Sequence, residues 1–184
     1  TAAGPAFEGA QISSGMRAGE GAIEFVEIGE DVQSLVIGGT KPRGICGSGL
    51  IDLVAELLRG GIIDATGRLM DQGELGESSP KLVERIRPGE AGNEFVVAWA
   101  SETADGGDIV LTQRDIRELQ LAKGAIRAGT MILQKVLDIK DEDIDELLLA
   151  GAFGNYIRKE SAMGMGLLPR IPLDRIRSVG NAAR

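Results

Sequence analysis

The residues with the clearest potential for chemistry form a short glycine loop near the C-terminus, made of Gly151, Ala152, Phe153, Gly154 and Asn155. The loop directly follows residues 147–150, an apolar run typical of a buried strand. Because glycine has no Cβ, a ligand can approach its backbone closely. Ligands in open α/β sheets bind at the carboxyl ends of strands. The pattern favours a ligand-binding strand–loop–helix unit, although an ordinary turn that binds nothing has the same composition.

A second glycine-rich segment, residues 44–49, precedes a strongly amphipathic helix. Free backbone N–H groups at a helix start favour anions. The glycine spacing matches neither a Walker A loop nor a dinucleotide-binding fingerprint. Tight packing of the helix against a sheet is therefore slightly favoured over anion binding. Cys46 could be a reactive thiol at the helix start, but without a histidine partner a small buried core residue is the better interpretation.

A third group of polar side chains lies on one face of a predicted helix over residues 112–138. Gln120, Lys123 and Arg127 are spaced three and four residues apart, so they project from the same side. This face could contact phosphate or ribose, although most such faces are simply solvated. Asp141, Asp143 and Asp145 have the alternate spacing of a calcium loop, but the later positions of that motif do not match, which favours a solvated turn.

Composition excludes several classes of protein. The 184 residues carry a formal charge of −8 and no histidine, which disfavours a nucleic-acid-binding module and removes histidine-based catalysis and metal sites. The single cysteine cannot form an internal disulfide, and a reducing cytoplasm is the simplest compartment. No run is long enough to span a membrane, and no signal-peptide pattern opens the chain. Neither end has the character of a natural terminus, so a fragment of a larger protein is expected.

The elements that must position these residues follow from periodicity. Residues 23–28 and 32–37 predict two strands of a hairpin. Apolar residues at helical spacing predict a helix over Ser48–Arg59 with Ser48 as its cap. Residues 62–111 are less regular, contain strands at 94–99 and 109–111, and could form a small sub-lobe.

The longest helix should begin with the capping box that starts at Thr112 and should end near Asp138. Its expected buried face includes Ile116, Leu119, Ile126, Leu133 and Val136, and its small residues near Gly124 and Gly129 suggest close packing of a neighbour. The helices at 48–59 and 112–138 should pack on one mixed sheet.

In that sheet, residues 147–150 are expected to form an interior strand. A helix over 159–165 and a strand over 176–179 complete the predicted elements.

Five motifs occur in an order that is far more specific than any one of them: Thr1–Gly9 (TAAGPAFEG), Arg43–Asp52 (RGICGSGLID), Gln113–Ile126 (QRDIRELQLAKGAI), Leu149–Asn155 (LAGAFGN) and Gly166–Pro169 (GLLP). The series resembles the reductive activators of corrinoid proteins, a family of iron–sulfur ATPases in the superfamily of acetate kinase, sugar kinases, heat-shock chaperones and actin. The resemblance covers nearly the whole chain and is weakest near residues 66–108.

The resemblance implies an α/β fold, a ribonuclease-H-like mixed sheet flanked by helices, which is the C-terminal half of an actin-like ATPase with a small irregular insertion. It implies that Gly151–Asn155 lines an adenosine pocket, with Lys123 and less certainly Gln120 facing it, and that residues 180–183 form a connecting helix. ATP with Mg²⁺ would bind the complete protein, and a [2Fe-2S] cluster would lie in a missing N-terminal region. The implied partner is a corrinoid protein whose inactive cobalt(II) is reduced to cobalt(I) for methyl transfer, and a homodimer is possible.

The chain departs from the full family pattern because it lacks a cysteine cluster and the phosphate-binding loops, so alone it is expected to be inactive as an ATPase. Two alternatives remain open at this point. One is an activator of another redox enzyme, such as a dehydratase, or a small-molecule kinase of the same superfamily. The other is a non-catalytic interaction domain in which the glycine loops only pack.

Overall fold

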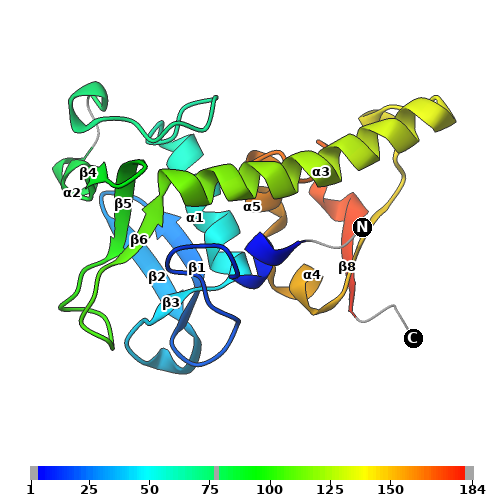
Figure 1. The fold of residues 1–184 in the computed structure, drawn as a ribbon. Helices are drawn as coiled ribbons and strands as arrows, with labels where there is room; N and C mark the ends of the chain where they lie inside the picture. The colour runs from blue at the N-terminus through cyan, green and yellow to red at the C-terminus, as the bar shows by residue number, and fades with distance from the viewer. Residues whose placement is uncertain (1–3, 77–78, 181–184) are drawn as a thin grey trace.

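The computed structural model describes residues 4–76 and 79–180. Its strands are β1 (Ala22–Ile28), β2 (Val32–Val36), β3 (Gly44–Ile45), β4 (Ile86–Gly89), β5 (Gly92–Ala98), β6 (Ile109–Thr112), β7 (Leu147–Ala150) and β8 (Ile176–Gly180). Its α-helices are α1 (Gly47–Arg59), α2 (Pro80–Glu84), α3 (Gln113–Leu137), α4 (Ala152–Tyr156) and α5 (Lys159–Gly164). Figure 1 shows these elements arranged along the length of α3. The expected α/β class is confirmed.

The described strands form three small sheets with the orders β2-β1-β3, β4-β5-β6 and β7-β8. The prediction of one mixed sheet, which would contain strand 147–150 and pack against both long helices, is therefore wrong for the described residues, whose strands form separate sheets. In the first, β1 and β2 form the predicted antiparallel hairpin and β3 pairs parallel to β1. The middle sheet is entirely antiparallel.

Helix α1 is the most buried helix of the fold. All eleven residues from Gly47 to Leu57 are buried, because β1 packs on one side of the helix and α5 on another. The N-cap is Cys46 without a side-chain capping bond, so the prediction that Ser48 caps the helix is wrong. A Cβ on Gly49 would overlap the carbonyl oxygen of Ile23, so glycine is required for this close approach to β1. The packing interpretation of this glycine segment is confirmed.

Segment 62–111 contains α2 and the β4-β5-β6 sheet, and it joins the rest of the fold through the apolar core. Phe95 and Leu111 are fully buried in the same hydrophobic cluster as the residues of α1. A buried cation helps to hold the segment: the Arg85 guanidinium donates to the carbonyl oxygens of Val96 and Val97 at 3.0 and 3.1 Å and pairs with Asp31 of the hairpin loop at 2.6 Å.

Helix α3 has the predicted boundaries and the predicted capping box. The Thr112 side chain accepts a hydrogen bond from the Asp115 backbone N–H, and Asp115 in turn accepts one from the Thr112 backbone N–H at 2.9 Å. Only the first turns are buried, with Ile116 and Leu119 1% exposed.

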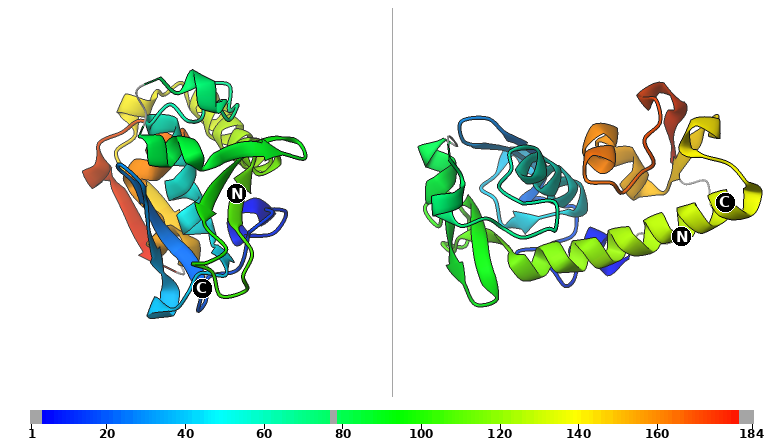
Figure 2. Two further views of the ribbon diagram at one scale, coloured as in Figure 1. Left: turned by 90° about the vertical axis from the view of Figure 1, so that its left-hand side faces the viewer. Right: turned by 90° about the horizontal axis from the view of Figure 1, so that it is seen from above.

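Ile126 is half-buried against the core, but the predicted apolar face is wrong at its end, since Leu133 and Val136 are 63% and 75% exposed. Nor does any described atom lie close to the helix at Gly124 or Gly129, so the close packing expected there is also wrong for the described residues. The right-hand view of Figure 2 shows the second half of α3 continuing past α1 and the first two sheets, alongside the C-terminal elements.

The C-terminal unit consists of β7, α4, α5 and β8. Strand β7 pairs in parallel with β8 on one side, and its residues alternate between half-buried and exposed, with Leu148 55% exposed. The expectation of an interior strand is therefore wrong for the described residues, because no second described strand covers the other edge of β7. The expected connecting helix at 180–183 falls, apart from Gly180 at the end of β8, outside the described residues.

In the described part of the chain, no helix is both long enough and apolar enough to cross a membrane.

Candidate functional site

A cavity of about 600 Å³ lies between the N-terminus of α1 and the end of α4. This volume falls within the range of sites that hold small molecules. The lining comes from the N-terminal loops, β1, the end of the first hairpin, the start of α1 and the last residue of α4: Phe7, Glu8, Met16, Arg17, Ala18, Gly19, Glu24, Ile37, Cys46, Gly47, Ser48 and Tyr156. The cavity thus brings together the second glycine segment and Tyr156, the last residue of the short helix that contains residues 152–155 of the glycine loop.

The wall formed by α1 combines backbone N–H groups with two small polar side chains. The Cys46 thiol is buried, donates to the Ile23 carbonyl oxygen at 3.4 Å and lies 3.3 Å from the Ser48 hydroxyl. The first N–H groups of any α-helix lack partners within the helix. The wall can therefore donate hydrogen bonds to an acceptor on a ligand.

Charged side chains supply the remaining polar groups of the cavity. Among the described residues, the side chains of Arg17 and Glu24 make no hydrogen bond or ion pair with other groups, and Glu8 also faces the cavity. Two carboxylates would repel phosphate, but they accept hydrogen bonds from hydroxyl and amino groups. This arrangement suits a ribose and a purine better than a polyphosphate.

The glycine loop has the backbone conformation that its composition predicts. Gly151 has a φ of +92°, which disfavours a side chain, and its N–H donates to the Gly180 carbonyl oxygen at 2.6 Å. A Cβ on Gly154 would approach Leu149 to 2.9 Å. Ala152 and Phe153 begin α4, and Asn155 is exposed one residue before the cavity-lining Tyr156. Residues 152–155 of the predicted loop are thus part of α4, and none of Gly151–Asn155 is among the residues that line the cavity.

Lys123 and Gln120 are held elsewhere by the fold. The Lys123 ammonium donates to the Met165 carbonyl oxygen at 2.8 Å, and the Gln120 amide donates to the Thr66 carbonyl oxygen at 2.9 Å. Both line a separate pocket of about 50 Å³, which is far smaller than a nucleoside requires. The structure does not bring these two residues together with Gly151–Asn155, and their role in nucleotide binding stays a prediction. Arg127, from the same helix face, pairs with Asp141 at 3.1 Å.

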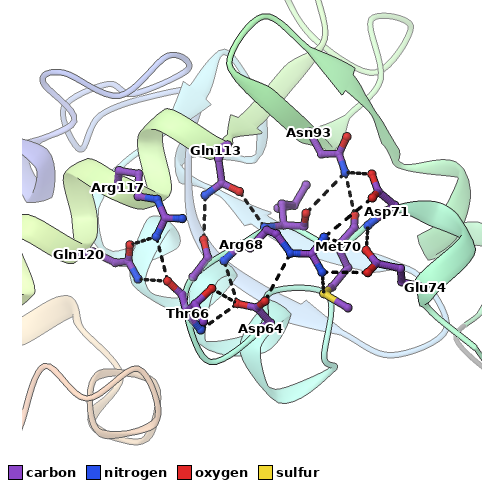
Figure 3. A network of polar contacts seen from close by, with 12 residues as sticks. Asp64, Thr66, Arg68, Met70, Asp71, Glu74, Asn93, Gln113, Arg117 and Gln120 are labelled. Carbon is purple, nitrogen blue, oxygen red and sulfur yellow. Dashed lines mark hydrogen bonds and ion pairs between the residues drawn. The ribbon is translucent and has the colours of Figure 1, made fainter.

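Gln120 belongs to a surface network that fastens residues 64–74 to α3 and β5 (Figure 3). At its centre, the Arg68 guanidinium donates to both carboxylate oxygens of Glu74, at 2.8 and 2.9 Å. The bonds from Arg68 hold the pKa of Glu74 at about 2, well below its usual value. Hydrogen bonds from the Thr66 side chain and then the Arg68 backbone lower the pKa of Asp64 to about 2. The groups of this network are exposed and hydrogen-bond to one another, which is typical of a structural role.

Sequence reasoning missed a second charged cluster, formed by Asp52 of α1 and Arg158 between α4 and α5, neither of which lines the cavity. The Asp52 side chain is 2% exposed, and its Oδ1 lies 3.9 Å from Arg158 Nε. Burial raises the pKa of Asp52, although hydrogen bonds from Ser161 and the Val26 backbone act in the opposite direction. The only signal in the sequence was an acidic residue directly after the apolar pair at the start of α1.

The geometry can now be set beside known proteins. The family model described as the C-terminal domain of RACo, the ASKHA domain, matches residues 1–184. This chain belongs to that family. The match spans every described element, including the 62–111 segment, and it places the fold in the ASKHA group, as the sequence motifs had indicated.

Two curated relatives and one solved structure agree with the family. The chain is 44% identical over its whole length to the corrinoid activation enzyme RamQ of Eubacterium limosum, of which it covers 31%. It is 31% identical over 91% of its length to the [Co(II) methylated amine-specific corrinoid protein] reductase of Methanosarcina barkeri, of which it covers 30%. A solved structure named reductive activator for corrinoid, iron–sulfur protein matches 97% of the chain with a TM-score of 0.86 and 47% identity, and the match covers 28% of that protein. The chain thus spans about a third of the length of these relatives.

The described residues also bear on metal binding. They contain no group of three or more cysteine, aspartate or glutamate side chains, the metal-ligating types present in this chain, arranged to hold a metal ion. Asp141–Asp143 forms a short 3-10 turn, and Asp141 accepts hydrogen bonds from Arg127 and Gln134. The solvated-turn interpretation fits this geometry better than a calcium loop.

Proposed function

We propose that this chain is the C-terminal nucleotide-binding half of an ATP-dependent activator that reduces the cobalt(II) of a corrinoid protein to cobalt(I). The observation that carries the proposal is 44% identity over the whole chain to a protein named a corrinoid activation enzyme. The name of the second relative states the same chemistry, a reductase of a Co(II) corrinoid protein. Residues 1–184 would form one ribonuclease-H-like half, with 62–111 as a sub-lobe, in a cytoplasmic protein that could form a homodimer.

The cavity beside α1 is the proposed site for the adenosine end of ATP. Its apolar walls suit a purine ring, while Glu8 and Glu24 can accept hydrogen bonds from ribose hydroxyls or the purine amino group. Tyr156 would close one side of the site. The small residues of Gly151–Asn155, directly before Tyr156, would let the ligand approach their backbone closely. The phosphates and Mg²⁺ would extend toward a preceding half of the complete protein.

The proposed chemistry is a one-electron transfer. An electron would leave a reduced [2Fe-2S] cluster in the preceding region and reach cobalt(II), which becomes cobalt(I) as the cluster is oxidised. ATP can favour this transfer only through a difference in its affinity for two states of the complex with the corrinoid protein. The role of this chain would be to bind ATP. The elements around the cavity would then couple ATP binding to the change between the two states of the complex.

Calorimetry on the complete protein tests the nucleotide site. Tyr156→Ala should weaken ATP binding about tenfold, the size expected for loss of one aromatic contact. Because Tyr156 is 67% exposed, the fold should not change. Leu35→Ala is the matched control, since Leu35 is 57% exposed on β2 and outside the cavity. Equal ATP affinity in wild type and Tyr156→Ala would contradict the assignment of the cavity.

A further inference from the structure

The pair formed by Asp52 and Arg158 is not closed, and it joins a buried carboxylate, 2% exposed, to a guanidinium side chain that is 35% exposed. Asp52 Oδ1 and Arg158 Nη1 are both inaccessible to solvent and have no hydrogen-bond partner among the described residues. Their side chains approach each other to 3.9 Å, measured from Arg158 Nε to Asp52 Oδ1. A closed ion pair between these groups has a separation of about 2.7–2.9 Å. The distance from Nε to Oδ1 is therefore about 1 Å longer than in a closed ion pair.

Each partner is held at this separation by contacts with other elements. Asp52 takes hydrogen bonds from Ser161 of α5 and from the Val26 backbone of β1, while Glu56 adds a second nearby carboxylate. The Arg158 guanidinium lies over the Phe25 ring, 4.8 Å from its centre. The cost of the open contact falls mainly on Asp52, because its carboxylate is buried and its Oδ1 has no hydrogen bond. A shorter contact with Arg158 would lower that cost.

The position of the pair connects it with the cavity. Asp52 lies one helical turn after Ser48, which lines the cavity from α1, and Arg158 lies two residues after Tyr156, which lines it from α4. The pair therefore joins α1 to the segment that directly follows α4, although neither residue lines the cavity itself. A ligand that contacts both walls would draw the end of α4 toward α1, and this is the movement that closes the pair.

We propose that Asp52 and Arg158 are positioning residues whose ion pair closes when a nucleotide occupies the cavity, so that the pair sets the bound separation of α1 and α4. This inference rests on the proposed function, because it takes ATP as the ligand. Closing the pair gives a hydrogen bond to two buried groups that lack one in the open state. Part of the nucleotide's affinity then comes from residues that do not touch it.

A double-mutant cycle on ATP affinity in the complete protein tests this coupling. Asp52→Asn and Arg158→Gln should each weaken ATP binding about tenfold, and the double variant should bind no more weakly than either single variant, since all three lose one shared interaction. Arg158→Lys should restore part of the affinity because it keeps the charge. Arg68→Gln is the control, because Arg68 pairs with Glu74 in the exposed surface network outside the cavity and should leave affinity unchanged. Melting temperatures of all variants, measured without nucleotide, report whether each one folds.

The possible results separate this inference from the function on which it rests. If the single variants melt at lower temperature but bind ATP as wild type does, the pair is only structural and the inference is wrong. It is also wrong if the two losses multiply to about a hundredfold in the double variant, because the residues would then act independently. If wild type itself binds no ATP, the proposed function and this inference both fail.

Discussion

The two clusters of charged side chains in this domain differ both in burial and in how completely they are paired. Around Arg68 the groups are exposed, and the hydrogen bonds to Glu74 measure 2.8 and 2.9 Å. Between α1 and the start of α5, the Asp52 carboxylate is buried and Arg158 lies 3.9 Å away, measured from its Nε to Asp52 Oδ1. The surface cluster ties residues 64–74 to α3 and β5, whereas Asp52 and Arg158 in the other cluster do not form a closed ion pair.

This difference indicates which cluster serves function. Exposed ion pairs contribute little because water competes for both partners. Buried charges without a closed partner are expensive, and a fold retains them where their rearrangement is used. The cluster with the poorer geometry in the described structure is therefore the better candidate for coupling ligand binding to movement.

The largest difference between the clusters should appear on removal of the cation. Arg158→Ala should lower the free energy of unfolding by about 2–4 kcal/mol, because it leaves the buried Asp52 carboxylate without its counter-charge. Arg68→Ala should produce a clearly smaller loss, since water can replace Arg68 at Glu74. Urea unfolding of both variants measures the comparison. A greater loss in Arg68→Ala would show that the surface network, and not the buried pair, dominates stability.

An intermediate effect on stability is expected at acid pH, and it arises from the surface cluster. The pKa values of Asp64 and Glu74 are lowered to about 2, so both carboxylates stabilise the fold above about pH 4 and lose that contribution as the pH falls toward 2. The melting temperature of wild type should fall over this range, and that of the Asp64→Asn/Glu74→Gln variant should fall less steeply. Glu90→Gln, on an exposed turn, is the control. Identical slopes for wild type and the double variant would show that the network does not hold the pKa values down.

The smallest effects are expected from Gln120→Ala and Lys123→Met, which remove hydrogen bonds to the Thr66 and Met165 carbonyl oxygens. Each should cost about 1 kcal/mol of stability or less. Their ATP affinity decides whether the helix face takes part in the nucleotide site as the resemblance implied. From the geometry we expect calorimetry to show wild-type affinity, and a loss of tenfold or more would place these side chains at the nucleotide.

The elements with strong local patterns could be predicted from the sequence. The hairpin of β1 and β2, the boundaries of α3 and the capping box at Thr112 each depend on a few neighbouring residues. The strand–glycine–helix order around residues 147–156 could be predicted because a strand, two glycines and a helix-compatible segment follow one another directly, while the ligand-binding role of 151–155 stays a prediction. Its positive φ at Gly151 agrees with that prediction.

The parts that depend on tertiary contacts could not be predicted. The apolar spacing of α1 places Asp52 on the side opposite the predicted buried face, yet α5, which lies about a hundred residues later, covers that side as well. Conversely, Leu133 and Val136 continue the apolar pattern of α3 but lie beyond the elements that bury its first turns. The pairing of β7 on one side only likewise depends on which strands lie next to it, and local composition does not specify this.

The central claim is tested most directly by following the cobalt of a purified corrinoid protein by visible absorption while the complete protein and an electron donor are present. We predict that cobalt(I) forms when ATP is added, that it does not form without ATP, and that Tyr156→Ala requires about ten times more ATP for the same rate. Formation of cobalt(I) at the same rate with and without ATP would contradict the account.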